Sequence, residues 1–270
     1  MEFNDYKSLE ESGARFVEKL GRKGTKHISQ RILCNGENYV LKKFRSESEA
    51  IRESKAHEIL SEQTDLLLPR KIFRDREVIL YEYILELGEC TPIEMIEDWQ
   101  KIHINNELAN YFEVENPRAE YIEWLAGKII ERGDLYGKNR GEYSRIIKIG
   151  ISDLVNPPEL GVVHGDLHLG NVIVRGGFRF YIDLETCAVK DPITDLVPTV
   201  LNHLDWKDRL VQYYCGITGA DEGAVKRRLT TLSMFRGTKL MGYQDNRNIK
   251  KEIKLKARRR IIKSLDSLLE

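Results

Sequence analysis

The sequence predicts an α+β protein of two lobes, in which a small β-rich lobe over residues 1–84 precedes a larger helical lobe over residues 85–270. Two observations lead to this prediction. Short strand-like runs fill most of the first ninety residues around a single helical segment, and helical patterns dominate after about residue 90. A chain of 270 residues also suits two modest domains. Because ligands often bind between such lobes, we expect a cleft there.

The strands of the first lobe are indicated by apolar runs that turn residues interrupt. Asn35-Gly36 is the strongest hairpin signal, because both residues tolerate the positive φ angles of a two-residue turn. A second hairpin is expected around Asp75-Arg76. The helix opens with a Ser and is rich in good helix formers. The expected strands span residues 14–20, 27–34, 38–44, 71–74 and 77–84, and the expected helix spans residues 46–62.

The second lobe opens with a clear helix-start signal. Thr91-Pro92-Ile93-Glu94 combines a capping Thr, a Pro at the first helical position and a Glu that completes a capping box. Asn116-Pro117 opens a second helix that ends near Gly133, and residues 142–155 form a third. After these helices we expect β structure at residues 160–163 and 171–183, with a bend at residues 175–177, and helices from residue 191 onward.

Composition and charge exclude several classes of protein. Lys and Arg total 43 and Asp and Glu total 43, so a globally polybasic nucleic-acid binder is disfavoured. Apolar residues make up 41% of the chain, which is enough for a core and argues against disorder. The four cysteines are far apart and form no CxxC pair, which disfavours a zinc site or a disulfide framework. With no apolar leader and no run long enough to span a membrane, we expect a cytoplasmic protein.

The densest polar cluster is His164-Gly165-Asp166-Leu167-His168-Leu169-Gly170-Asn171, which stands between two β-like runs. Asp183 ends the second of these runs. In this arrangement Asp166 can accept a hydroxyl proton, while Asn171 and Asp183 offer hard oxygen ligands to a Mg²⁺ that bridges nucleotide phosphates. The alternative is a polar turn between two buried strands.

The segments HGDLHLGNV, YIDLE and DPITDL together resemble the aminoglycoside phosphotransferase and choline kinase family, whose members have a bilobal protein-kinase-like fold. The resemblance covers residues 14–210 and is most specific over residues 164–195. It implies that Asp166 is the catalytic base and that Asn171 and Asp183 bind the metal. It also implies supporting roles for His164, His168 and Asp195, the last by bracing the backbone amides of the motif.

The resemblance further implies a nucleotide clamp in the first lobe. Tyr39–Phe44 is similar to the kinase strand that carries a phosphate-binding lysine, which makes Lys42 the candidate. Lys43 is the alternative, although strand alternation places it on the opposite face. The partner carboxylate should come from the helix over residues 46–62. Glu53 is preferred to Glu58 because it shares the apolar stripe of that helix.

Two backbone segments complete the expected nucleotide site. The turn from Gly21 to Thr25 occupies the place of a phosphate-binding loop, so the amides of Gly24 and Thr25 are candidates although the turn departs from GxGxxG. The strand over residues 77–84 resembles the one that leads into a kinase hinge. The resemblance implies that the Glu82 carbonyl and the Ile84 amide pair with adenine.

These observations predict transfer of the γ-phosphate of ATP, with Mg²⁺, to a hydroxyl of a small molecule such as a sugar, an amino alcohol or an antibiotic-like compound. Two alternatives stay open, an atypical protein kinase and a non-catalytic nucleotide-binding scaffold. Only 11 residues separate Asp183 from Asp195, too few for the long peptide-binding segment of protein kinases. Gly165 also replaces the Arg that receives an activating phosphate in protein kinases.

The charge pattern does not decide the acceptor. Residues 97–160 carry 8 basic and 12 acidic side chains, whereas residues 191–270 carry 16 basic and 10 acidic ones. The second segment includes the basic run Lys254–Arg260, either the solvated face of a terminal helix or a wall facing an anionic acceptor. Two more residues have structural interpretations, Asp191 as a turn residue and His103 as a core histidine.

Overall fold

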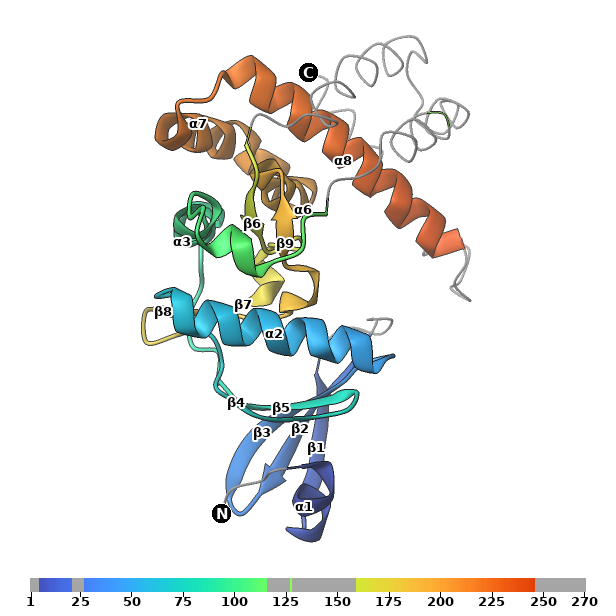
Figure 1. The fold of residues 1–270 in the computed structure, drawn as a ribbon. Helices are drawn as coiled ribbons and strands as arrows, with labels where there is room; N and C mark the ends of the chain where they lie inside the picture. The colour runs from blue at the N-terminus through green and yellow to red at the C-terminus, as the bar shows by residue number, and fades with distance from the viewer. Residues whose placement is uncertain (1–4, 21–26, 116–126, 128–158, 246–270) are drawn as a thin grey trace. The chain divides into compact units, whose positions relative to one another are not determined.

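The computed structural model describes residues 5–20, 27–115, 127 and 159–245 (Figure 1). The chain divides into two compact units. Unit 1 consists of Met1–Thr91 and Leu169–Cys187, and unit 2 consists of Pro92–His168 and Ala188–Glu270. Sequence order had placed residues 169–187 with the second lobe, but in the structure this segment folds with the first ninety residues.

A five-stranded antiparallel sheet forms the centre of unit 1, with the strand order β1-β2-β3-β5-β4. The β2–β3 turn has positive φ at both central residues, 52° at Asn35 and 80° at Gly36, as the Asn-Gly signal predicts. The strands span Arg15–Leu20 (β1), Ile28–Cys34 (β2), Glu37–Lys43 (β3), Lys71–Asp75 (β4) and Val78–Glu82 (β5).

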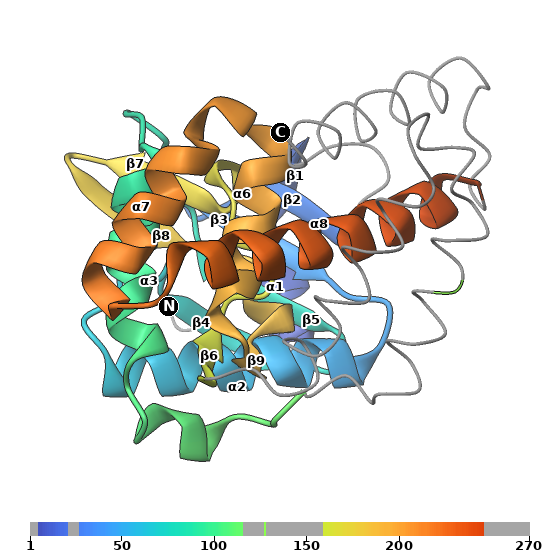
Figure 2. The ribbon, with the colours of Figure 1, turned by 90° about the horizontal axis from the view of Figure 1, so that it is seen from above.

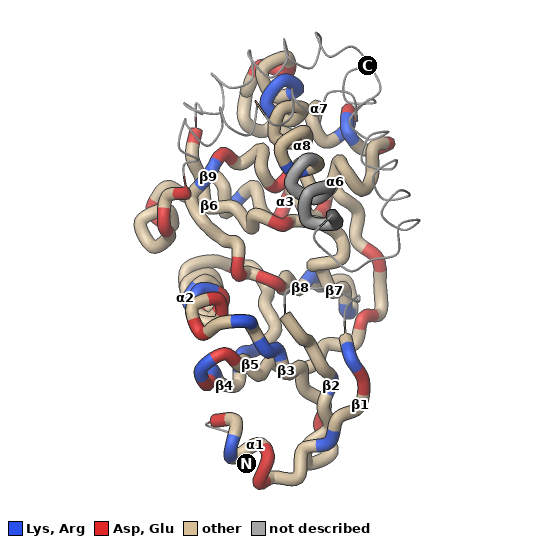
Figure 3. Tube along the Cα trace, turned by 90° about the vertical axis from the view of Figure 1, so that its right-hand side faces the viewer, with Lys and Arg blue, Asp and Glu red and all other residues tan. Residues whose placement is uncertain are grey.

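Each face of this sheet has its own small core. Helix α2, Glu47–Gln63, begins after the capping residue Ser46 and buries Ala50 against Ile79 and Tyr81. The intervening residue Leu80 points the other way, into a second cluster that includes Leu9 of the short helix α1, Tyr6–Glu11. Strand alternation therefore gives β5 two buried faces. Acidic and basic positions lie interspersed along α2 (Figure 3).

Backbone hydrogen bonds tie residues 169–187 into unit 1. This segment contains a hairpin of β7, Val172–Arg175, and β8, Phe178–Tyr181, which turns at two glycines. The amide of Tyr181 donates to the Leu67 carbonyl over 3.0 Å, and the amide of Leu87 donates to the Val174 carbonyl over 2.8 Å. The 3₁₀ turn Leu184–Thr186 then packs against α2.

Unit 2 is mainly helical around a two-stranded antiparallel ladder of β6, Gly161–Val163, and β9, Ala188–Lys190. A Cβ atom on Gly161 would lie 2.2 Å from the backbone oxygen of His103, so only glycine lets β6 approach the end of α3 this closely. Helix α8 packs across α6 and α7 (Figure 2). The helices are α3 (Pro92–His103), α6 (Leu196–Asn202), α7 (Lys207–Thr218) and α8 (Glu222–Asp245), with 3₁₀ turns at Leu108–Tyr111, Pro192–Asp195 and Leu204–Trp206.

The predicted α+β class is confirmed by a β-sheet unit followed by a mainly helical one. Helix α3 begins at Pro92, where the capping signal placed it. The helices expected over residues 116–133 and 142–155, and the basic run over residues 254–260, lie outside the described residues, except for residue 127, which is helical. In the described part of the chain, no helix is long and apolar enough to cross a membrane.

Candidate functional site

Strand β3 separates its two lysines. Lys42 is 3% exposed, whereas Lys43 lies on the other face of the strand and is exposed beside Glu77. The Lys42 Nζ atom lies 2.5 Å from Oε2 of Glu53 and 2.6 Å from Oδ1 of Asp183. Three residues singled out from the sequence are therefore brought together within unit 1.

Glu53 lies on the buried side of α2, which is the side that the apolar stripe indicated. Its Oε1 atom accepts a hydrogen bond from the Tyr81 hydroxyl over 3.0 Å, so both carboxylate oxygens are bonded. The competing candidate Glu58 instead pairs with Lys71 in a more exposed contact. A buried carboxylate held from two sides presents the Lys42 ammonium in one position.

The electrostatics of this cluster favour the charged forms of Lys42 and Asp183, whereas burial raises the pKa of Glu53. Burial alone would lower the pKa of Lys42, but the negative charges of Glu53 and Asp183 outweigh it and raise the pKa. Burial would raise the pKa of Asp183, but the charge of Lys42 and the hydrogen bond from His27 hold it well below its usual range. Lys42 and Asp183 are therefore both ionised at neutral pH.

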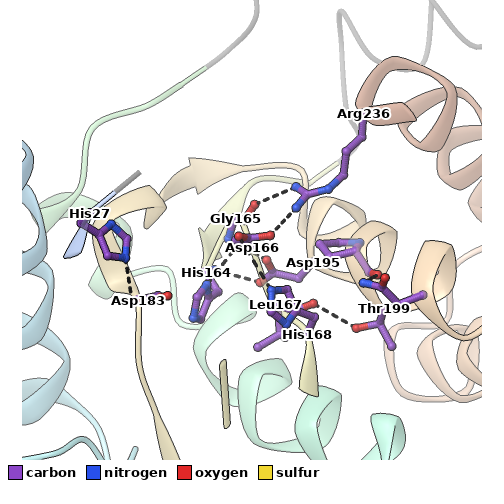
Figure 4. Close-up of polar contacts among 12 residues, drawn as sticks. His27, His164, Gly165, Asp166, Leu167, His168, Asp183, Asp195, Thr199 and Arg236 are labelled. Atoms are coloured by element: carbon purple, nitrogen blue, oxygen red, sulfur yellow. Dashed lines mark hydrogen bonds and ion pairs between the residues drawn. The ribbon is translucent and has the colours of Figure 1, made fainter. Parts of the chain in front are cut away.

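His27 is a member of this cluster that the sequence analysis missed. Its Nε2 atom lies 3.5 Å from Oδ1 of Asp183, and its Nδ1 atom lies 3.1 Å from Oε2 of Glu185 (Figure 4 shows the first contact). Burial would lower the pKa of His27, but the bonds to these two carboxylates raise it to about 9. His27 thus adds a second positive charge beside Asp183.

The predicted metal ligands Asn171 and Asp183 both belong to unit 1. Asn171 ends a 3₁₀ turn and is buried, and its backbone oxygen accepts a hydrogen bond from the amide of Ile182 over 3.1 Å. Asp183 has a left-handed backbone with φ 64°, uncommon for a residue other than glycine. No group of three or more His, Cys, Asp or Glu suited to a metal occurs among the described residues. One carboxylate and one amide fit Mg²⁺, which takes its remaining ligands from phosphates and water.

In unit 2, a single buried carboxylate holds the segment that carries Asp166. Asp195 is 0% exposed and accepts hydrogen bonds from the amides of His164 (2.9 Å) and Gly165 (2.7 Å). His103 Nε2 donates to the same carboxylate over 2.9 Å. Gly165 has φ 79°, a conformation that favours glycine, so this position suits the turn that directs its amide at Asp195.

Asp166 itself is only partly buried, with a side chain 38% exposed. Its amide donates to Nδ1 of His164 over 3.4 Å, and its Oδ2 atom lies 3.9 Å from Nε2 of His168. The next residue, Leu167, is fully buried, and its carbonyl accepts a hydrogen bond from Thr199 Oγ1 over 3.0 Å. The segment is thus anchored on both sides of Asp166 (Figure 4), and the Asp166 carboxylate stays partly exposed.

Two arginines of α8 were not anticipated. Arg236 donates from Nη2 to Oδ1 of Asp166 and from Nη1 to the Gly165 carbonyl over 3.4 Å. Arg228 forms a buried two-point contact with Asp191, which also accepts from the Ile193 amide over 3.0 Å. Asp191 is therefore a turn residue, as expected, and in addition anchors α8.

The remaining predicted positions are backbone groups. Gly24 and Thr25 lie outside the described residues. Glu82 ends β5, and its amide donates to the Arg70 carbonyl over 2.9 Å. Ile84 follows two residues later with a side chain 6% exposed. Glu82 directly follows Tyr81, which contacts Glu53, and both Glu82 and Ile84 belong to unit 1.

Comparisons with known proteins give a match to one family model and several similar folds. Residues 151–227 match the model of the phosphotransferase enzyme family. Comparison with curated proteins gave no match by sequence. Among solved structures, a spectinomycin phosphotransferase in complex with ADP and spectinomycin aligns with a TM-score of 0.65 at 13% identity, covering 94% of this chain and 92% of that one.

Two further solved structures are similar. A macrolide 2′-phosphotransferase from Brachybacterium faecium has a TM-score of 0.60 at 16% identity over 90% of this chain and 91% of that one. The streptomycin–ATP ternary complex of APH(2″)-IIa has a TM-score of 0.59 at 14% identity over 96% and 95%. The predicted resemblance is therefore confirmed: the chain is similar to the phosphotransferase family around the 164–171 motif and has the fold of solved phosphotransferases along most of its length.

Proposed function

We propose that this protein is a small-molecule kinase, which transfers the γ-phosphate of ATP to a hydroxyl group of a small acceptor. The Lys42 Nζ atom, held by Glu53 at 2.5 Å and by Asp183 at 2.6 Å, is the main observation behind this proposal. A buried ammonium next to an ionised carboxylate is the arrangement that phosphoryl transfer uses to hold nucleotide phosphates and their metal. The similarity to structures that contain ADP or ATP supports an adenine nucleotide as the phosphate donor.

Each residue then has one task. Lys42 binds the nucleotide phosphates, and Asn171 and Asp183 hold Mg²⁺, which neutralises charge on the phosphates when it is bound. Asp166 accepts the proton of the acceptor hydroxyl and orients its oxygen, and Asp195 keeps the backbone around Asp166 in place. His164 and His168 support that segment. The Glu82 carbonyl and the Ile84 amide, with the loop amides of Gly24 and Thr25, complete the proposed nucleotide contacts.

The experiment that tests this function has two parts. Calorimetry with ATP in millimolar Mg²⁺ should show binding to the folded protein. A panel of sugars, amino alcohols, aminoglycosides and hydroxy acids should then be scored by acceptor-dependent ADP release. Peptides are included because they would reveal a protein kinase. Nucleotide binding without ADP release for any acceptor would favour a scaffold, and no nucleotide binding would refute the proposal.

A further inference from the structure

A guanidinium group lies on the carboxylate that the proposed function assigns as the general base. Arg236 follows Asp166 by 70 residues in the chain, and its Nη2 atom donates to Oδ1 of Asp166. Its Nη1 atom donates to the carbonyl of Gly165 over 3.4 Å. Figure 4 shows one planar fork that reaches from α8 onto both residues.

The helix that carries Arg236 is firmly attached within unit 2. Arg228, eight residues earlier, is buried with Asp191, and α8 packs against α6. Eight residues correspond to about 12 Å of helix, so this buried pair holds the register of α8 close to Arg236. The side chains of Arg236 and Asp166 are 29% and 38% exposed, so a small molecule can reach both.

This contact fixes the charge that an acceptor meets at Asp166. The Asp166 side chain is 38% exposed, so an acceptor hydroxyl can approach the carboxylate beside the bond from Arg236 to Oδ1. The guanidinium compensates the negative charge that would otherwise attract an ammonium group. An acceptor with a positive charge beside its reacting hydroxyl is therefore repelled, whereas one with an oxyanion there is attracted.

We propose that Arg236 is a specificity-determining residue, which selects acceptors that carry a carboxylate or a phosphate next to the hydroxyl that is phosphorylated. The guanidinium has five N–H donors in a planar fork, of which the two contacts above use two, and such a fork suits both kinds of oxyanion. His168, with its Nε2 atom 3.9 Å from Oδ2 of Asp166, lies beside the same carboxylate. The inference rests on the proposed function, because Asp166 must receive the acceptor hydroxyl.

The test uses acceptors that differ mainly in charge. One series is glucose, glucosamine, glucuronate and glucose 6-phosphate, and the other is glycerol, 2-amino-1,3-propanediol, glycerate and glycerol 3-phosphate. For the wild-type protein, we expect kcat/KM from ADP release to be at least tenfold higher for the best anion than for its neutral counterpart. The amino compounds should be the poorest acceptors. Comparing kcat/KM for the carboxylate and the phosphate member of each series shows which of the two oxyanions is preferred.

Variants of one residue separate specificity from structure. Arg236→Gln should lower kcat/KM at least tenfold more for the anionic acceptors than for the neutral ones, and mainly through KM, so that the preference for anions is lost. Arg236→Lys keeps the charge without the fork and should lie between. The control is Lys226→Gln, which removes one positive charge from the same helix about 15 Å away, where Lys226 contacts Glu222 and Asp208. It should leave the preference unchanged.

A second measurement does not depend on turnover. Glucuronate, glucose 6-phosphate and glycerol 3-phosphate are titrated into the wild-type protein with ADP and Mg²⁺ present, and at least one should bind ten times more weakly to Arg236→Gln. The inference would be overturned if the wild type showed no preference for anionic acceptors, or if Arg236→Gln kept the wild-type preference. Either result would leave the proposed function standing. No binding of any of these anions together with no anion-dependent turnover would also overturn it. Failure of the protein to bind Mg²⁺-ATP would refute the proposed function itself.

Discussion

The Nε2 atom of His103 lies 2.9 Å from Oδ2 of Asp195, a carboxylate 92 residues away in the chain, and both side chains are buried. Through this contact, the last residue of α3 supports the carboxylate that accepts the amides of His164 and Gly165. The histidine is a buried core residue, as the sequence interpretation proposed. Its polar function is to complete the bonding of Asp195.

The first prediction concerns this carboxylate. In Asp195→Asn, an amide nitrogen replaces one of the oxygens that the backbone amides and His103 contact. Because hydrogen bonds to a charged group contribute about 1.5–3 kcal/mol each, the free energy of unfolding should fall by about 2–3 kcal/mol. The kcat should also fall, whereas nucleotide affinity should change little. Denaturant unfolding, ADP release and calorimetry measure these three quantities in turn, and an unchanged unfolding midpoint would contradict the expectation.

The second prediction compares two glutamates of α2. Glu53→Gln weakens the support of Lys42, so kcat/KM for ATP should fall by about 10²-fold, the usual effect of losing one well-placed electrostatic contact. Glu58→Gln is the matched control, since it removes an equal charge from the same helix in a contact with Lys71. It should change kcat/KM less than threefold. If both variants lost kcat/KM for ATP to a similar extent, the Lys42–Glu53 pair would have no special role in nucleotide binding.

The third prediction divides the roles of two aspartates. Asp166→Asn should bind Mg²⁺-ATP with nearly wild-type affinity and lose at least 10²-fold in kcat, because general-base catalysis contributes about 10²–10⁴-fold. Asp183→Asn should lose Mg²⁺-dependent nucleotide affinity as well as turnover. Calorimetry with and without Mg²⁺, together with ADP release on the best acceptor, tests both. Wild-type kcat in Asp166→Asn would show that another group accepts the proton.

The fourth prediction is a pH dependence of stability. Burial lowers the pKa of His57 below its ordinary value of 6.5, although its Nε2 atom donates to the Pro69 carbonyl over 2.6 Å. Below about pH 6.5 the unfolded chain therefore binds more protons at this position than the folded one, so stability is lost as pH falls through the lowered pKa. Between pH 7 and 5, the wild type should lose more stability than His57→Gln, by at most about 1.4 kcal/mol per pH unit.

Chemical denaturation at each pH, at constant ionic strength, measures this difference. Gln keeps an N–H donor for the Pro69 carbonyl and cannot be protonated in this range, so the carboxylates contribute equally in both proteins. Parallel pH profiles for the wild type and His57→Gln would contradict the assignment.

Local pattern predicted a large part of this structure. The Asn35-Gly36 signal placed the first hairpin because a two-residue turn needs positive φ at both positions. Helical periodicity singled out Glu53 rather than Glu58, and the structure pairs Glu53 with Lys42. In both cases the information lies within a few residues of the position concerned.

Contacts between segments that are distant in the sequence could not be predicted from local sequence patterns. Arg236 is 70 residues from Asp166 and stands in a helix whose sequence marks no basic face. His27 meets Asp183 and Glu185 only after the sheet and residues 169–187 have come together. For the same reason, the sequence placed residues 169–187 with the second lobe, although they fold with unit 1. Nothing near Tyr181 indicates that its amide bonds to Leu67.

The discontinuous make-up of unit 1 determines when it can be completed during synthesis on the ribosome. Its first part ends at Thr91, but the segment that supplies Asp183 is finished only at Cys187, 96 residues later. At typical elongation rates of about 5–20 residues per second, this delay is on the order of 5–20 s. During that interval the Leu67 carbonyl lacks the Tyr181 amide. The face of α2 that later contacts the Leu184–Thr186 turn is uncovered by that turn. The Lys42–Asp183 contact can therefore form only late in synthesis.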